Sequence, residues 1–184
     1  MSSLVPNRVF FTKGVGVHKE KLQSFELALR MAGIEKCNLV KVSSIFPPMC
    51  KIVPRSKGLT YLKPGQIVYC VLGQIATNEP YRMMSVAIGL AIPSNRVHYG
   101  YISEHEEFGI AAKETSDYVE DLAATMLATT LGVDFDPNES YDERREIYRM
   151  SGKIVETRST TQTARGDSEG RWTTAVAAAV FLME

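Results

Sequence analysis

Two stretches of the chain carry apolar residues at the three- and four-residue spacing of an amphipathic helix. The first covers residues 18–33, with its apolar stripe at Leu22, Phe25, Leu29 and Ala32. The second covers residues 117–130, with a stripe at Val119, Leu122, Ala123, Met126 and Leu127. Gly33 and Gly132 follow these stretches, and glycine readily adopts the left-handed conformation that ends a helix. The pattern therefore predicts two helices.

Runs rich in β-branched and aromatic residues predict strands elsewhere. They cover residues 38–42, 66–75, 85–92, 97–103, 153–161 and 172–183. Small residues at every second position of 85–92 indicate a strand packed closely on a helix or a second sheet, with a buried helix as the alternative. We expect irregular structure at 51–63, a short helix with loops at 134–150, a polar turn at 165–170, and an ordinary turn at Gly14-Val-Gly16.

Helices that lie between groups of strands are typical of a layered α/β or α+β fold. The chain has 184 residues and a mass of 20.4 kDa, which suits one compact domain. It contains no repeat of fixed period and no low-complexity linker. We therefore expect residues 1–184 to form a single domain.

The charge balance argues against nucleic acid or an anionic membrane as a partner, because 21 basic residues match 21 acidic ones. The longest apolar run, residues 175–183, has about half of the roughly 20 residues that a membrane helix needs. The first residues lack the basic-then-apolar order of a signal peptide. Cys37, Cys50 and Cys70 are odd in number and show no CxxC spacing, so we expect buried thiols in a reducing cytoplasm.

Two common binding motifs, GxGxxG and the P-loop, are missing from the sequence. One cluster has the residue types of a metal site, namely His105 with Glu104, Glu106 and Glu107. No second histidine stands at ligand spacing from it. We therefore expect no metal and interpret the cluster as a solvated acidic loop.

Ser43-Ser44 directly follows the strand predicted at 38–42, and Pro47-Pro48 comes three residues later. A serine pair at a strand end is most often a turn that bonds its own backbone. Here the prolines fix the bend, and a strained backbone can be used for chemistry. Attack of the Ser44 hydroxyl on the Ser43 carbonyl would give an ester by an N-to-O acyl shift. Elimination would then cut the chain and leave dehydroalanine, which hydrolyses to a pyruvoyl group and ammonia.

Several segments strongly resemble the pyruvoyl-dependent arginine decarboxylases. The most specific is Asn38-Leu-Val-Lys-Val-Ser-Ser-Ile-Phe-Pro-Pro48, and the others are residues 25–29, 32–34, 85–93, 100–104 and the C-terminal strand. Residues 134–150 fit the family less well. The resemblance implies a four-layer α/β/β/α sandwich, assembled as trimers or pairs of trimers with active sites between protomers.

The resemblance also implies roles for individual residues. Cleavage between Ser43 and Ser44 would give chains 1–43 and 44–184, and Ser44 would become the pyruvoyl cofactor. Asn38 matches the asparagine that assists self-cleavage, by hydrogen-bonding the oxyanion. Glu104 matches the general acid that protonates the substrate α-carbon after carbon dioxide leaves. The substrate-binding residues would be Glu26, which faces the guanidinium, together with Ser43 and Ile45.

The reaction that these roles imply is decarboxylation of L-arginine to agmatine, through a Schiff base between the substrate amine and the pyruvoyl ketone. Two alternatives stay open at the level of sequence. One keeps the pyruvoyl group but takes another amino acid such as histidine, because Glu26 stands where the family's archaeal enzymes have aspartate. The other is an unprocessed, non-catalytic trimeric binding protein of the same fold.

Overall fold

The structure is a computed structural model and describes residues 4–134, 136 and 138–183. The described residues form four helices and nine strands, so the predicted mixture of α and β structure is confirmed. The helices are α1 (Lys21–Ala32), α2 (Arg55–Thr60), α3 (Ala112–Leu131) and α4 (Tyr141–Met150). The strands are β1 (Arg8–His18), β2 (Asn38–Lys41), β3 (Ile45–Phe46), β4 (Lys51–Ile52), β5 (Ile67–Thr77), β6 (Met83–Pro93), β7 (Gly100–Phe108), β8 (Ile154–Arg165) and β9 (Trp172–Leu182).

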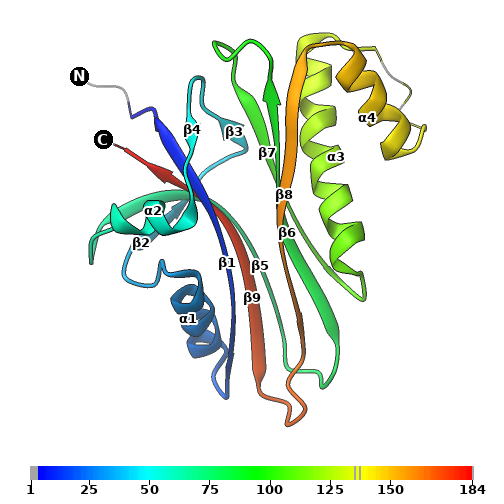
Figure 1. Ribbon diagram of the computed structural model, residues 1–184. Helices are drawn as coiled ribbons and strands as arrows, with labels where there is room; N and C mark the ends of the chain where they lie inside the picture. The colour runs from blue at the N-terminus through cyan, green and yellow to red at the C-terminus, as the bar shows by residue number, and fades with distance from the viewer. Residues whose placement is uncertain (1–3, 135, 137, 184) are drawn as a thin grey trace.

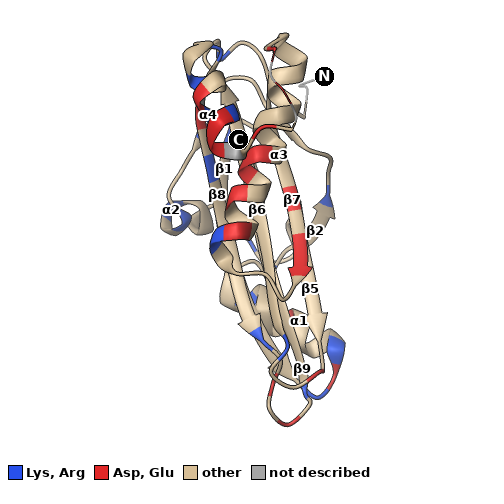
Figure 2. Cartoon of the chain, turned by 90° about the vertical axis from the view of Figure 1, so that its right-hand side faces the viewer, with Lys and Arg blue, Asp and Glu red and all other residues tan. Residues whose placement is uncertain are grey.

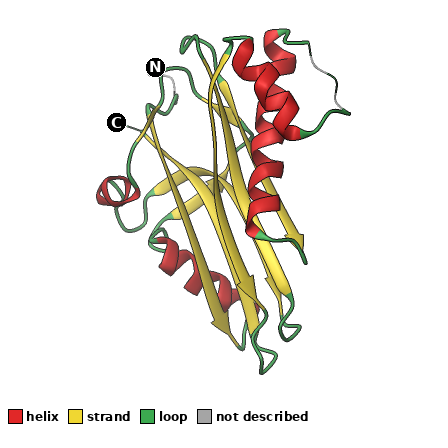
Figure 3. Cartoon of the chain, turned by 45° about the vertical axis from the view of Figure 1, so that its right-hand side comes forward, coloured by secondary structure: helices red, strands yellow, loops and turns green. Residues whose placement is uncertain are grey.

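The strands form two sheets. One has five strands in the order β2-β5-β9-β1-β4, and the other has four in the order β3-β7-β6-β8. The long strands of both sheets run side by side along the length of the molecule (Figures 1 and 3). Between them lies a core that includes Val71, Ile88 and Ile102, all at most 2% exposed. Successive side chains of a strand point to opposite faces, so every second residue of the long strands points into this core. The central strands β6 and β9 are buried almost throughout, since helices cover their other faces.

Helix α1 covers the other face of the five-stranded sheet and packs Ala28 and Ala32 against it. Its approach depends on Gly14 and Gly16, which lie within β1. A Cβ at either position would come within 2.2 Å of a carbonyl oxygen of α1. The prediction of an ordinary turn at Gly14-Val-Gly16 is therefore wrong: the two glycines are strand residues that let a helix backbone lie close to the sheet.

Helix α3 covers the four-stranded sheet on the side away from the inter-sheet core. Gly89 of β6 faces it, and a Cβ there would lie 2.1 Å from the carbonyl oxygen of Val119. The close packing predicted from the small residues of 85–92 is thus confirmed, and these residues form a strand. The glycines expected to end the two long helices, Gly33 and Gly132, have φ of 80° and 61° in the left-handed region.

Three other expectations differ from the structure. Residues 51–63 contain β4 and α2 rather than only irregular chain. Residues 104–107 belong to β7, because Ser85–Ile88 of β6 pair with them, so the acidic cluster is not a loop. The strand Arg8–His18 was not predicted. The short helix expected within 134–150 is α4, although residues 135 and 137 lie outside the described residues.

The three cysteines are free thiols; Cys50 and Cys70 are buried and Cys37 is partly so. Burial raises the pKa of the Cys50 and Cys70 thiols to about 11, which suits inert structural cysteines. In the described part of the chain, no helix is both long and apolar enough to cross a membrane. A cytoplasmic location stays a prediction from cysteine usage.

Candidate active site

The Ser43–Ser44 peptide bond lies where the chain passes from one sheet to the other. On one side, the N–H of Val42 donates a 3.0 Å hydrogen bond to the carbonyl of Cys70 in the five-stranded sheet. On the other side, the N–H of Ile102 donates a 2.7 Å hydrogen bond to the carbonyl of Ser44, next to the β3–β7 pairing of the four-stranded sheet. The two flanks of this bond are therefore held by different sheets.

The backbone turns sharply at Ser44. The N–H of Ile45 donates a 3.0 Å hydrogen bond to the carbonyl of Ser43, two residues earlier, which is the bonding pattern of a γ-turn. The carbonyl that Ser44 would attack thus already faces a hydrogen-bond donor. Ser44 itself is partly exposed, so its hydroxyl is not sealed in the core.

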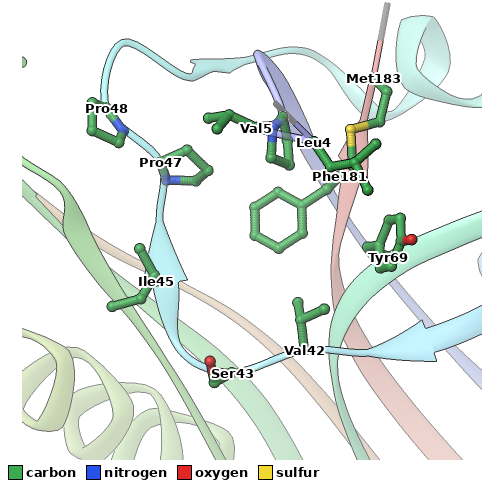
Figure 4. Close-up of a pocket in the computed structure, with 11 residues that line it drawn as sticks. Leu4, Val5, Val42, Ser43, Ile45, Pro47, Pro48, Tyr69, Phe181 and Met183 are labelled. Carbon is green, nitrogen blue, oxygen red and sulfur yellow. The ribbon is translucent and has the colours of Figure 1, made fainter. Parts of the chain in front are cut away.

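A cavity of about 430 Å³ opens beside the serine pair. Figure 4 shows Ser43 and Val42 at the lower edge of the view and the ring of Phe181 among the side chains that line the cavity. Apart from Ser43, its walls are mostly apolar and come from both ends of the chain as well as from the segment after the serines: Leu4, Val5, Pro6, Val42, Ile45, Pro47, Pro48, Tyr69, Phe181 and Met183. A volume of this size is within the usual range for small-molecule sites.

Glu104 stands on β7 two residues after Ile102, so both side chains point to the face that looks toward the five-stranded sheet. The residue is exposed at the margin of this layer, yet partial burial of its carboxyl raises the pKa of Glu104 above the ordinary value. The negative charge of Glu106 acts in the same direction. The positive charge of Lys41 and a hydrogen bond from the backbone of Leu72 oppose the shift. A raised pKa suits a group that must hold a proton before donating it.

Comparison with known proteins assigns nearly the whole chain to one family. The family model described as pyruvoyl-dependent arginine decarboxylase matches residues 8–184. A protein of Methanosarcina mazei named pyruvoyl-dependent arginine decarboxylase 2 is 58% identical over 179 residues, which cover 97% of this chain and 98% of that protein. A protein of Chloroherpeton thalassium named probable pyruvoyl-dependent arginine decarboxylase is 56% identical over 180 residues, 98% of this chain and 99% of that protein. The chain belongs to the pyruvoyl-dependent arginine decarboxylase family.

Members of this family depend on a pyruvoyl group, and the residues at the serine pair fit its formation. The Ser44 hydroxyl adjoins the peptide bond it would attack, and the N–H of Ile45 faces the carbonyl oxygen of that bond. The carbonyl of Ser44 is bonded to β7, so residue 44 would stay fixed to the four-stranded sheet after a cut before it. Ser43 also borders the cavity.

The structure does not bring Asn38 or Glu26 to the serine pair within one protomer. Asn38 begins β2, and its side-chain amide donates a 3.0 Å hydrogen bond to the carbonyl of Gly65. Since a strand advances about 3.3 Å per residue, Asn38 lies about 16 Å along the chain from Ser43. Glu26 stands on α1, outside the five-stranded sheet, where its carboxylate pairs with Arg30 at 2.7 Å. The assigned roles of Asn38 and Glu26 stay predictions.

The residues of the acidic cluster on β7 are divided between the two faces of the strand. His105 stacks on Tyr118 of α3 with ring centroids 4.4 Å apart, and its Nε2 lies 3.0 Å from a carboxylate oxygen of Glu107. His105 and Glu107 therefore point to the α3 side of the sheet, away from Glu104. Within the described ranges, no group of three or more His, Cys, Asp or Glu side chains is placed to hold a metal ion.

Sequence reasoning missed several residues of the site. Lys41 and Leu72 act on the Glu104 carboxyl, and Tyr69 lines the cavity. The strand pattern of 66–75 places Tyr69 on the opposite face from Cys70, but nothing in the sequence indicates which face meets the serine pair. Nothing in the sequence pattern marked Lys41 as a site residue except its position two residues before Ser43.

Proposed function

We propose that this chain decarboxylates L-arginine to agmatine and carbon dioxide, using a pyruvoyl group made from its own Ser44. Family membership and the names of the two relatives support the reaction and the substrate. The observation that carries the proposal is the Ser43–Ser44 bond itself. Its two flanks are bonded to different sheets, and its carbonyl faces the N–H of Ile45.

Self-cleavage begins when the Oγ of Ser44 attacks the carbonyl carbon of Ser43. The hydroxyl proton passes to the leaving nitrogen of residue 44, and an ester replaces the peptide bond. Negative charge develops on the Ser43 oxygen during this step, where the N–H of Ile45 stabilises it. Such a donor is most useful when it is already in place, as the γ-turn provides.

Elimination then breaks the Cα–H and Cβ–Oγ bonds of residue 44. Chain 1–43 ends in the new carboxylate of Ser43, and chain 44–184 begins with dehydroalanine. Water hydrolyses the imine tautomer of that residue and releases ammonia. The hydrogen bonds of Val42 to Cys70 and of Ile102 to Ser44 keep each new chain end on its own sheet.

The pyruvoyl group supplies an electron sink for the carbanion that loss of carbon dioxide leaves on the substrate. Glu104 donates a proton to the substrate α-carbon, and partial burial of its carboxyl, which raises its pKa, helps it to keep that proton before donating it. Its strand position, two residues beyond the residue bonded to Ser44, supports this role. The cavity beside Ser43 has apolar walls that suit the methylene chain of arginine.

We further propose that protomers assemble as a trimer or a pair of trimers with a site at each interface. Glu26 and Asn38 would then serve the serine pair of a neighbouring protomer. Several apolar residues near the serine pair and along β2 and β5 are exposed in the single protomer, which supports an interface with a neighbouring protomer at this surface. They are Val40, Val42, Ile45, Met49 and Ile67, each 37–62% exposed. The placement of α1 and α3 on opposite outer faces supports the four-layer α/β/β/α order.

Intact-mass measurement of the denatured protein tests the cofactor, and turnover assays test the substrate. We expect two chains, 1–43 and 44–184, with the larger lighter by one ammonia than a chain that begins with serine. The processed protein should release carbon dioxide from arginine far faster than from histidine, ornithine, lysine or aspartate. A single uncut mass of 20.4 kDa would favour the non-catalytic alternative. Full cleavage without arginine turnover would favour another amino acid.

A further inference from the structure

The turn that follows β3 holds Met49 in the left-handed region of the backbone. Its φ is 58°, a conformation that residues with a Cβ adopt rarely and at a cost. Met49 is 62% exposed in the single protomer, so packing of its side chain within the protomer does not enforce this conformation. A strained residue of this kind persists only where its surroundings hold it.

Arg96 holds the backbone on both sides of Met49. This residue lies in the loop between β6 and β7 and is half-buried. Its carbonyl accepts a 3.0 Å hydrogen bond from the N–H of Met49, and its guanidinium donates a 2.6 Å hydrogen bond to the carbonyl of Cys50. The guanidinium carbon also lies 5.6 Å from the centroid of the Phe46 ring. Arg96 thus contacts Met49 through its backbone carbonyl and the next residue, Cys50, through its side chain.

These contacts bear on the serine pair because the intervening chain is short and stiff. Strand β3 consists of only Ile45 and Phe46, paired with Tyr101 and Gly100. Pro47-Pro48 follows and fixes φ at two successive residues. A shift of the turn at Met49 therefore passes to β3. The N–H of Ile45, the donor to the Ser43 carbonyl, belongs to that strand.

We propose that Arg96 is a positioning residue for self-cleavage: it holds the turn at Met49 and thereby fixes β3 and the N–H of Ile45 against the Ser43 carbonyl. This inference rests on the proposed cleavage at Ser43–Ser44. Arg96 acts through the turn and β3. A displacement of about 1 Å at reacting atoms can lower a rate by about 10²-fold. A residue that positions the Ser43–Ser44 bond without touching it can therefore control the rate of cleavage.

Arg96→Met tests the proposal, with Arg82→Met as a matched control. Arg82 directly precedes β6, and its guanidinium carbon lies 4.3 Å from the centroid of the Phe108 ring. Its carbonyl accepts a hydrogen bond from the N–H of Gly166, and its side chain pairs with Glu79. Arg82 therefore makes the same kinds of contact as Arg96, but far from the serine pair. Time-resolved intact mass during cell-free synthesis gives the rate at which the full chain becomes 1–43 and 44–184. We expect Arg96→Met to slow cleavage by about tenfold or more, and Arg82→Met to change it less than about twofold.

A second substitution separates positioning from loss of stability. Met49→Gly removes the conformational cost at φ 58°, so in the Arg96→Met background it should restore much of the cleavage rate. Urea unfolding of both arginine variants in a Ser44→Ala background, where the chain stays whole, gives their stabilities. Cleavage of Arg96→Met at the wild-type rate would overturn the proposal. It would also be overturned if Arg96→Met lowered the cleavage rate together with the free energy of unfolding and Met49→Gly did not restore the rate. Absence of cleavage in the wild-type chain would instead contradict the proposed function.

Discussion

The N–H of Ile102 donates a 2.7 Å hydrogen bond to the carbonyl of Ser44. This bond ties the residue that would become the cofactor to strand β7, and β7 carries Glu104 two residues further on. Since alternate residues of a strand share a face, Glu104 points with Ile102 toward the five-stranded sheet. One strand therefore fixes both the proposed electrophile and the proposed proton donor. Figure 2 shows that β7 carries further acidic residues beyond this point and that α3 is also acidic.

Ser44→Ala removes the only hydroxyl that the proposed route uses as nucleophile. We expect this variant to remain one uncut chain of 184 residues and to lose arginine decarboxylation completely, as measured by intact mass and by carbon dioxide release. Ser94→Ala is the control, because Ser94 is an exposed serine whose hydroxyl bonds the carbonyl of Lys153. It should be cut and active. Decarboxylation by uncut Ser44→Ala would disprove the pyruvoyl mechanism.

Glu104→Gln should separate processing from turnover. The amide keeps the shape of the side chain but cannot donate the proton, and general acid catalysis contributes about 10²–10⁴-fold. We expect complete cleavage, and a fall of about 10²-fold or more in kcat for arginine. Glu107→Gln is the matched control on the opposite face of β7, where Glu107 bonds His105. Equal kcat values for Glu104→Gln and the wild type would rule out the assigned role.

The raised pKa of Glu104 also predicts how stability depends on pH. Burial makes the folded chain bind this proton more tightly than the unfolded chain does. Between the ordinary value near 4.5 and the raised folded value, the native state holds more protons, so the free energy of unfolding falls as the pH rises. We expect Glu104→Gln, in a Ser44→Ala background, to show a weaker decline over this window in urea unfolding. An unchanged pH profile would contradict the shift.

The sequence predicted most elements of this fold because their periods are long and regular. The spacing of Leu22, Phe25, Leu29 and Ala32 indicated α1, and the β-branched run at 66–75 indicated β5. The predicted stripe is not the buried face of α1, since Leu22 is 78% exposed and the helix buries Ser24, Ala28 and Ala32. Strand β1 was not predicted because Gly14 and Gly16 interrupt its apolar pattern. Only the packing of α1 explains why glycine is needed there, and no local rule contains that contact.

The candidate site was predictable only in part. Ser43 and Ser44 are adjacent in sequence, so their motif is local and specific. Lys41, Leu72 and Arg96 come from three different parts of the chain and act on the site only after the sheets have formed. The separation of Glu26 from the serine pair is likewise a property of the folded protomer, since α1 lies outside the five-stranded sheet.

The close packing of β1 on α1 predicts a large effect of a small substitution. Gly14→Ala would place a Cβ 2.2 Å from the carbonyl oxygen of Ala28, and neither backbone can yield without moving the helix. We expect a loss of about 1–3 kcal/mol or more in the free energy of unfolding, as for other overpacked sites. Gly65→Ala is the comparison: its φ is 78°, but a Cβ there meets nothing within 4 Å. Urea unfolding in a Ser44→Ala background should give the larger loss for Gly14→Ala.

The proposed contact of Glu26 with the substrate guanidinium can be tested against its contact within the protomer. The Glu26 side chain is 43% exposed and pairs with Arg30, an exposed ion pair that contributes little to stability. Glu26→Gln should therefore leave cleavage and folding intact. It should raise KM for arginine by about 10-fold or more, because a hydrogen bond to a charged group contributes about 1.5–3 kcal/mol. Arg30→Met, which frees the carboxylate, should leave KM unchanged or lower it. Steady-state kinetics with arginine decide the matter, and an unchanged KM in Glu26→Gln would remove Glu26 from the substrate site.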